Sequence, residues 1–167
     1  MNFKIRPIIK KDLEILNKKL KSKYAPTLHE DKLKEQEQGG SVWLIAWIDD
    51  KPVAHGQIRF NGSKAKEVRS KIKNCPHLES LHVKEEFRKK GIATQFMNFA
   101  EKLVKQKGFN KIGLSVEKDN EFLINLYKKR GYKDWQKGIV IETWEEVHDG
   151  KKKKIIEKCK YLIKKLK

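Results

Sequence analysis

The sequence predicts a single α/β (α+β) domain spanning residues 1–167, in which hairpins and one parallel crossover share a mixed sheet. Three observations support this prediction. The chain of 167 residues is long enough to bury one core without disulfides or metals. Its first half contains two apolar runs around a tight polar turn, which is typical of a β-hairpin. Farther along, a strand, a helical stripe and another strand follow through short loops, which predicts a right-handed crossover between parallel strands.

The N-terminal elements are predicted from alternation and helical spacing. Residues 3–7 alternate and stop at a proline, which indicates a short strand. Four apolar side chains then recur at helical spacing: Ile9, Leu13, Leu16 and Leu20. Asp12 stands where it favours a helix start. A second, weaker helix is predicted from about residue 29 to 38, before Gly39-Gly40 ends it.

The middle of the first half predicts a hairpin. Residues 42–49 and 52–60 are apolar runs on either side of Asp49-Asp50-Lys51, so we expect two strands joined by a tight polar turn. Residues 61–76 carry no clear period. We therefore expect a loop or a ragged extension of the strand there.

The crossover begins near His77. Leu78, Leu81 and Val83 indicate a strand, and a helical stripe that ends at Gly108 follows it. The stripe consists of Ile92, Ala93, Phe96, Ala100, Leu103 and Val104. The next strand alternates at Ile112, Leu114 and Val116.

The last third predicts one more helix and one or two strands. The helix carries Phe122, Leu123, Leu126 and Tyr127 and stops at Gly131, and a late strand begins at residues 139–141. Residues 151–166 fit the period of a helix and also that of a strand. Asp149-Gly150 is a hairpin signal, which favours a closing strand paired with residues 139–147.

The net charge of the chain is compatible with several kinds of polyanionic partner and does not distinguish between them. Charged residues make up 37% of the chain and the formal net charge is +18, which could steer it toward nucleic acid, membranes or a phosphorylated cofactor. All but five of the 40 basic residues are lysines, an excess that an AT-rich genome also produces. The lysine run at residues 151–154 is interpreted as the solvated arm of the last hairpin.

The cysteines and the apolar runs predict a reducing, cytoplasmic location. Cys75 and Cys159 form no spacing motif, so neither a zinc site nor a disulfide framework is indicated. The N-terminus lacks the continuous apolar segment of a signal peptide. The longest apolar run, residues 42–48, is too short to span a bilayer, so no membrane partner is expected.

A basic turn precedes the helix of the crossover. Arg88-Lys89-Lys90-Gly91 stands where a helix opening offers unpaired N–H groups and a partial positive charge to an anion. Gly91 would let the backbone approach an oxygen closely, and Ala93 keeps the first helical turn narrow. Free N–H groups from about Lys89 to Thr94 could therefore hold a pyrophosphate. The alternative is a solvated loop before an ordinary helix start.

Two motifs carry a family resemblance. Leu81-His82-Val83 followed by residues 87–93 resembles the acetyl-CoA signature of the GNAT superfamily of N-acetyltransferases, Arg/Gln-x-x-Gly-x-Gly/Ala, with Ala93 in place of the commoner glycine. Residues 114–132, with Asn120 before a helix that bears Tyr127, resemble that family's next motif. Together they cover residues 78–132 in the expected order. The resemblance implies a twisted, mostly antiparallel sheet of six to seven strands, with a central splayed parallel pair and about four helices.

The resemblance also implies roles for individual residues. The pyrophosphate of acetyl-CoA would be held by the loop Arg88, Lys89, Lys90, Gly91, Ile92, Ala93 and Thr94. The pantetheine arm would pair with the strand at Leu81, His82 and Val83, and Asn120 would lie near it. Tyr127 would protonate the departing thiolate and Glu79 would take the proton of the amine. The expected transfer is direct, without a cysteine nucleophile or a metal.

Each catalytic role has an alternative. Tyr127 could be an ordinary core residue on an apolar stripe, and Glu79 could be a solvated strand residue. His55 and His82 are further candidates for the base, although a lone strand histidine is usually packed or exposed. Acidic residues near 30–37 and 142–149 favour a cationic amine acceptor, either a small molecule or a peptide or protein.

Two other functions stay open. One is a basic protein that binds nucleic acid or the ribosome, and the absence of an RNA-binding aromatic signature or a DNA-reading helix motif argues against it. The other is an acyl-CoA sensor of the same fold that does not turn over. The sequence is compatible with a monomer or a homodimer.

Overall fold

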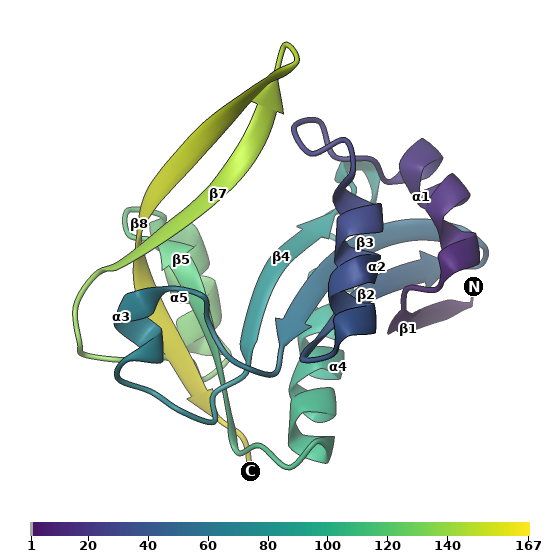
Figure 1. Ribbon diagram of the computed structural model, residues 1–167. Helices are drawn as coiled ribbons and strands as arrows, with labels where there is room; N and C mark the ends of the chain where they lie inside the picture. The colour runs from purple at the N-terminus through teal and green to yellow at the C-terminus, as the bar shows by residue number, and fades with distance from the viewer. Residues whose placement is uncertain (1) are drawn as a thin grey trace. The chain divides into compact units, whose positions relative to one another are not determined.

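The computed structural model describes residues 2–167, and over this range it contains eight strands and five α-helices (Figure 1). The chain divides into two compact units, which are described separately. The first unit comprises Met1–Arg59 and Leu78–Lys102, and the second comprises Phe60–His77 and Leu103–Lys167. The α-helices of residues 2–167 are all too short or too polar to cross a membrane. The expectation of one domain stays a prediction.

The first unit is built from a sheet whose strands follow in the order β1-β2-β3-β4. β1 pairs with β2 and β2 with β3, both antiparallel, so the predicted N-terminal strand and hairpin are confirmed. The elements that contribute to this unit are β1 (Phe3–Pro7), α1 (Leu13–Lys19), α2 (Leu28–Gln38), β2 (Ser41–Ile48), β3 (Lys51–Arg59), β4 (His77–Val83) and the first part of α4 (Ile92–Gln106).

Both faces of this sheet are covered by helices, which is why the side chains of β2 and β3 are almost continuously buried instead of alternating between buried and exposed. α1 and α2 pack on one face, where a core cluster includes Leu16, Leu33 and Trp43. α4 packs on the other face against Gly56, because a Cβ added there would lie 2.7 Å from Cε1 of Phe96. The glycine is therefore required by the close approach of the helix to β3.

The second unit contains the remaining strands, in the order β5-β8-β6, with β7 also paired to β8. All of these pairings are antiparallel. Its elements are α3 (Lys66–Arg69), β5 (Lys111–Glu117), α5 (Glu121–Lys129), β6 (Lys133–Asp134), β7 (Val140–His148) and β8 (Lys151–Lys165). His77, the first residue of β4, lies in this unit and pairs in parallel with Gly113 of β5. The mixed, mostly antiparallel sheet with one parallel pair is confirmed.

The ambiguous C-terminal segment is a strand. β8 pairs with β7 from His148↔Lys151 to Val140↔Cys159 (Figure 1). Asp149 and Gly150 connect the two strands with φ of 51° and 76°, as the two central residues of a type I′ hairpin turn require. Ile156, which a helical stripe would bury, is 63% exposed. Residues 151–154 are exposed, as predicted for the arm of a hairpin.

Several predicted details are wrong, each because a short element or a packing contact carries no period of its own. Residues 61–76, expected to be a loop or a ragged strand extension, contain the one-turn helix α3. Ile8 is buried, whereas Ile9 is 43% exposed. On α5 the buried residue is Ile124, whereas Phe122 is 79% exposed.

A partly buried ion pair fixes the entry into α1. Arg6 donates to both carboxylate oxygens of Asp12, at 2.7 and 2.8 Å, and the amide of Ile9 donates to the same group at 2.9 Å. Burial opposes ionisation of Asp12, but the hydrogen bonds and the charge of Arg6 outweigh it and lower its pKa below the ordinary value. Asp12 thus anchors the start of the helix without capping it in the usual way.

We expect Asp12→Asn to lower the stability of the protein at pH 7 by about 2 kcal/mol, or about 5 °C in Tm, because Arg6 loses its partner. Since the pKa is lower in the folded state, this stabilisation is complete above the unfolded pKa of about 4 and is lost as pH falls through the folded pKa. Thermal melts from pH 7 to 2 should therefore converge for the two proteins at the acid end. Asp50→Asn in the exposed hairpin turn is the control, and equal Tm values for Asp12→Asn and wild type at pH 7 would contradict the prediction.

Candidate functional site

The basic turn before α4 is a concave run of backbone amides. Lys89 and Gly91 have φ of 62° and 81°, so two left-handed residues flank Lys90 at the start of the helix. Gln95 is the first helical amide with a backbone acceptor, the carbonyl of Gly91 at 3.0 Å. The amides from Lys89 to Thr94 have no backbone acceptor within residues 2–167. Such an arrangement of unpaired N–H groups favours an anion.

The side chains of this turn leave the amides accessible. Nothing in the structure lies within 4 Å of a Cβ added at Gly91, so the space beside it is open. Lys89, Lys90 and Thr94 are exposed, whereas Ile92 is buried beneath the first turn of α4. Arg88 braces the turn: its Nε donates a hydrogen bond to the carbonyl of Val83 at 2.9 Å. The guanidinium thus ties the turn to the end of β4.

β4 has a backbone irregularity that the sequence did not indicate and that is typical of a β-bulge. Ser80, in the middle of the strand, has φ of 58°, which few residues other than glycine adopt. Side chains three residues apart on a regular strand point to opposite faces. Here Glu79 contacts Arg59 and His82 stacks on His55. Arg59 and His55 are four positions apart on β3, so their side chains lie on the same face of that strand. The bulge therefore places Glu79 and His82 on the same face of β4.

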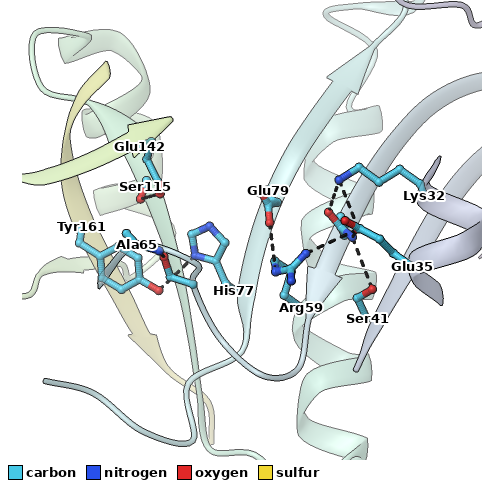
Figure 2. Close-up of polar contacts among 12 residues, drawn as sticks. Lys32, Glu35, Ser41, Arg59, Ala65, His77, Glu79, Ser115, Glu142 and Tyr161 are labelled. Atoms are coloured by element: carbon cyan, nitrogen blue, oxygen red, sulfur yellow. Dashed lines mark hydrogen bonds and ion pairs between the residues drawn. The ribbon is translucent and has the colours of Figure 1, made fainter. Parts of the chain in front are cut away.

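Glu79 lies in a network of alternating charges on that face (Figure 2). Arg59 lies 3.6 Å from carboxylate oxygens of both Glu79 and Glu35, and its side chain is only 16% exposed. Arg59 Nε nevertheless has no hydrogen-bond partner within residues 2–167. Lys32 adds a second cation, which donates to Gln57 Oε1 at 2.7 Å. Sequence reasoning missed Arg59, although it shares the alternation of His55 and Gln57 on β3.

An aromatic stack lies next to this network. The ring of His55 stacks on Trp43 at a centroid distance of 4.6 Å and on His82 at 5.3 Å, each at an interplanar angle of 28°. Burial, and then the neighbouring His82 and His29, lowers the pKa of His55 to about 3. Burial, and then the charge of Arg88, lowers the pKa of His82. Both imidazoles are therefore neutral at physiological pH.

Asn120 and Tyr127 lie in the second unit, on α5. Asn120 is the N-cap of this helix, and its Oδ1 accepts from the amide of Leu123 at 3.1 Å, a role that its place before a helix could have revealed. Burial raises the pKa of Tyr127, partly offset by the charge of Arg130, so the hydroxyl stays protonated at physiological pH. The ring of Tyr132 packs edge-on to it at 5.9 Å. Within residues 2–167 the Tyr127 hydroxyl makes no hydrogen bond.

The second unit also holds a polar cluster around the base of the β7–β8 hairpin (Figure 2). His77 Nδ1 lies 3.2 Å from the Tyr161 hydroxyl, and Ser115 donates to Glu142. Cys159 is buried beside three glutamates, and its pKa is raised, first by burial, so it is a poor nucleophile. Residues 2–167 contain no group of three acidic, cysteine or histidine side chains that could hold a metal ion.

Comparison with known proteins identifies the family of this fold and of these motifs. Residues 9–132, well over half of the chain, match the model of the acetyltransferase (GNAT) family. The chain belongs to the GNAT acetyltransferase family. The resemblance inferred from the two sequence motifs is confirmed, and the basic turn and Tyr127 both fall inside the matched region.

Solved structures of GNAT acetyltransferases share this fold. The PaiA N-acetyltransferase of Thermoplasma acidophilum, determined in complex with coenzyme A, is 21% identical, and the alignment covers 99% of each chain with a TM-score of 0.64. A chimera of the spermidine N-acetyltransferase SpeG from Vibrio cholerae and hSSAT is 15% identical over 99% of this chain and 96% of its own, with a TM-score of 0.69. A GNAT acetyltransferase from Elizabethkingia anophelis with acetyl-CoA bound is 15% identical over 99% of each chain, with a TM-score of 0.62.

The structure thus groups part of the predicted GNAT site. In the first unit, Leu81, His82 and Val83 of β4 run directly toward the basic turn, and Glu79 shares a face with His82. Asn120 and Tyr127 follow β5 in the second unit. The association of these two sets of residues around one ligand stays a prediction.

Proposed function

We propose that this GNAT protein is an acetyl-CoA-dependent N-acetyltransferase that transfers an acetyl group directly to a primary amine. The observation that supports this most is the open run of amides from Lys89 to Thr94, built around Gly91 within the matched family region. The proposed co-substrate is acetyl-CoA, and relatives of the same fold are recorded with coenzyme A or acetyl-CoA.

In this proposal the basic turn holds the pyrophosphate. A helix N-terminus contributes only about 0.3–1 kcal/mol to an exposed anion, so several amides and the charges of Lys89 and Lys90 must share the binding. Arg88 keeps the turn in place through its bond to Val83. The pantetheine arm pairs with the backbone of β4 at residues 81–83. Asn120 lies near that arm while its Oδ1 caps α5.

The proposed chemistry is a direct aminolysis of the thioester. The neutral amine attacks the carbonyl carbon, the C–N bond forms, and the C–S bond breaks to release the thiolate of CoA. A backbone amide near Val83 stabilises the oxyanion, and Tyr127 gives its proton to the thiolate. Glu79 takes the proton of the amine, directly or through a water molecule. The transfer uses no metal and no covalent enzyme intermediate.

The acceptor proposed is a small cationic amine or the amine of a peptide or protein. A relative of the same fold is described as a spermidine N-acetyltransferase, which supports a cationic acceptor. Within the first unit, however, Glu35, one of the acidic residues expected near the acceptor, is paired with Lys32 and Arg59. The cytoplasmic location and the choice between monomer and homodimer stay predictions.

The test of this function is release of free thiol from acetyl-CoA across a panel of polyamines, aminoglycosides, amino acids and peptides. Mass spectrometry should find the product heavier by one acetyl group. Tight binding of acetyl-CoA with no thiol release over the whole panel would instead support an acyl-CoA sensor. Salt-dependent retention on nucleic acid without acetyl-CoA binding would support a nucleic-acid-binding protein.

We expect Glu79→Gln to lower kcat/KM for the amine by about tenfold to a hundredfold, because the amide cannot accept the proton of the ammonium. The affinity for acetyl-CoA, measured by calorimetry, should change little. Glu86→Gln, a change in an exposed glutamate that pairs with Lys84, is the matched control and should keep full activity. Equal kcat/KM for Glu79→Gln and wild type would remove Glu79 from the role of base.

A further inference from the structure

The bulge in β4 has a specific partner on the neighbouring strand. Ser80 has a left-handed φ of 58° and an exposed side chain, so nothing that its own side chain buries explains this strained conformation. Strain of this kind persists only when surrounding contacts hold it. The carbonyl of Ser80 accepts a hydrogen bond from His55 Nδ1 at 2.9 Å. His55 lies on β3 and is 7% exposed.

We propose that His55 is a positioning residue, which latches the Ser80 bulge and thereby sets the face of β4 on which Glu79 and His82 lie. The inference rests on the proposed acetyl transfer, for which Glu79 is the base. Without the latch, β4 can relax toward regular alternation, in which Glu79 and His82 point to opposite faces. The proposed pyrophosphate site at the basic turn lies beyond the bulge and has its own brace in Arg88.

The chemistry of the bond specifies the form of His55. A carbonyl oxygen only accepts, so Nδ1 of His55 must carry the hydrogen. The buried ring is neutral, with its pKa lowered to about 3, and Nε2 therefore carries the lone pair. The titratable groups that face the ring are His82 from β4 and His29 and Lys32 from α2, all of which disfavour a charge on it. The latch is thus the Nδ1–H tautomer, and it stays intact across physiological pH.

A second histidine, His29, holds the His55 ring in place through Trp43. His29 of α2 bonds the carbonyl of Leu20 through Nε2 at 2.8 Å and accepts from Trp43 Nε1 through Nδ1 at 3.1 Å. Both nitrogens of His29 are therefore used, and the indole of Trp43 is fixed. That indole stacks on His55 at 4.6 Å. The orientation of the latch is therefore determined by α2 as well as by β3.

Two amide substitutions at His55 separate a hydrogen-bond latch from simple packing. In His55→Asn the amide nitrogen falls near the place of Nδ1 and can still donate to Ser80, whereas in His55→Gln the donor is displaced by one methylene. We expect kcat/KM for the amine to stay within about threefold of wild type in His55→Asn and to fall at least tenfold in His55→Gln. The dissociation constant for acetyl-CoA should change less than about threefold in both.

A substitution on the same strand is the control for a general loss of stability. Ile58 is fully buried and lies three positions after His55, on the opposite face of β3. Ile58→Ala should therefore lower the Tm without a change in kcat/KM. If His55→Gln lost activity only in proportion to a loss of folded protein, or if both amide variants were equally active, the latch would be refuted.

Glycine at the bulge provides an independent test. Ser80→Gly removes the strain of the left-handed conformation, so the bulge needs less help from His55. We expect the double variant His55→Gln/Ser80→Gly to recover at least threefold of the activity lost by His55→Gln. Additive losses in the double variant would contradict the proposal.

The tautomer can be measured without any assay of activity. In ¹⁵N spectra of the imidazoles at pH 7, His55 should show a protonated Nδ1 and a bare Nε2, and this signal should be insensitive to pH down to about 4. An Nε2–H tautomer would overturn the latch even in an active enzyme. Conversely, the expected tautomer together with a complete absence of acetyl transfer would leave the latch standing and refute the proposed function.

Discussion

Gly91→Glu is expected to weaken the binding of acetyl-CoA at least a hundredfold in titration calorimetry while the protein remains folded. Gly91 has φ of 81°, and open space lies where its Cβ would project. A glutamate side chain would occupy that space and bring a negative charge to amides that otherwise face the phosphates. The substitution also strains the backbone by about 1–2 kcal/mol, which the fold can tolerate.

The opposite end of α4 offers the matched control. Gly108 has φ of 94° and likewise no atom within 4 Å of an added Cβ. Gly108→Glu therefore has the same backbone strain and the same new charge, but it lies at the C-terminal end of the helix. We expect it to bind acetyl-CoA as the wild type does. Equal affinities for wild type and Gly91→Glu would show that the basic turn is not the pyrophosphate site.

Tyr127→Phe is expected to lower kcat by about a hundredfold to a thousandfold, with little change in the affinity for acetyl-CoA. The proposed role of the hydroxyl is to protonate the thiolate, which exists only late in the reaction. Because this hydroxyl makes no hydrogen bond within residues 2–167, its removal should leave the Tm within about 1 °C of wild type.

The pH dependence gives a second measurement for Tyr127. Its pKa is raised above the ordinary value of about 10 because the side chain is buried, so the acid stays protonated over the working range. Activity that depends on this proton should fall only above about pH 10. This alkaline fall in the pH–activity profile should be absent in Tyr127→Phe. The ring of Tyr132 packs against that of Tyr127, so Tyr132→Phe is the control for the loss of a neighbouring hydroxyl. Full turnover in Tyr127→Phe would assign the proton donor to another group.

Long elements with a clear period could be predicted from the sequence, and short or interrupted ones could not. Residues 42–60 read as a hairpin and residues 92–106 as a helix, because their apolar patterns extend over several turns or pleats. α3 is a single turn and β6 has two residues, so neither repeats a pattern. The exposed Phe122 and the buried Ile124 show a related limit, since hydrophobic character alone does not decide which side of a helix meets the core.

In the candidate site, too, features made by neighbours in the sequence could be predicted, and features made by distant residues could not. The basic turn was predictable because its chemistry is local: a glycine, several cations and a helix start follow one another in the chain. The bulge at Ser80 depends on His55, 25 positions earlier, and the charge network around Glu79 depends on Arg59 and Glu35. No spacing in the sequence connects these residues.

The sequence by itself determined the order of the elements, the family motifs and the basic turn before a helix, because each arises from neighbours along the chain. Only the tertiary structure decided that residues 151–165 form a strand, that Glu79 faces an arginine and that His55 holds a bulge. The physical reason is that strand pairing, ion pairs and left-handed backbone are stabilised by partners that folding brings from distant parts of the chain.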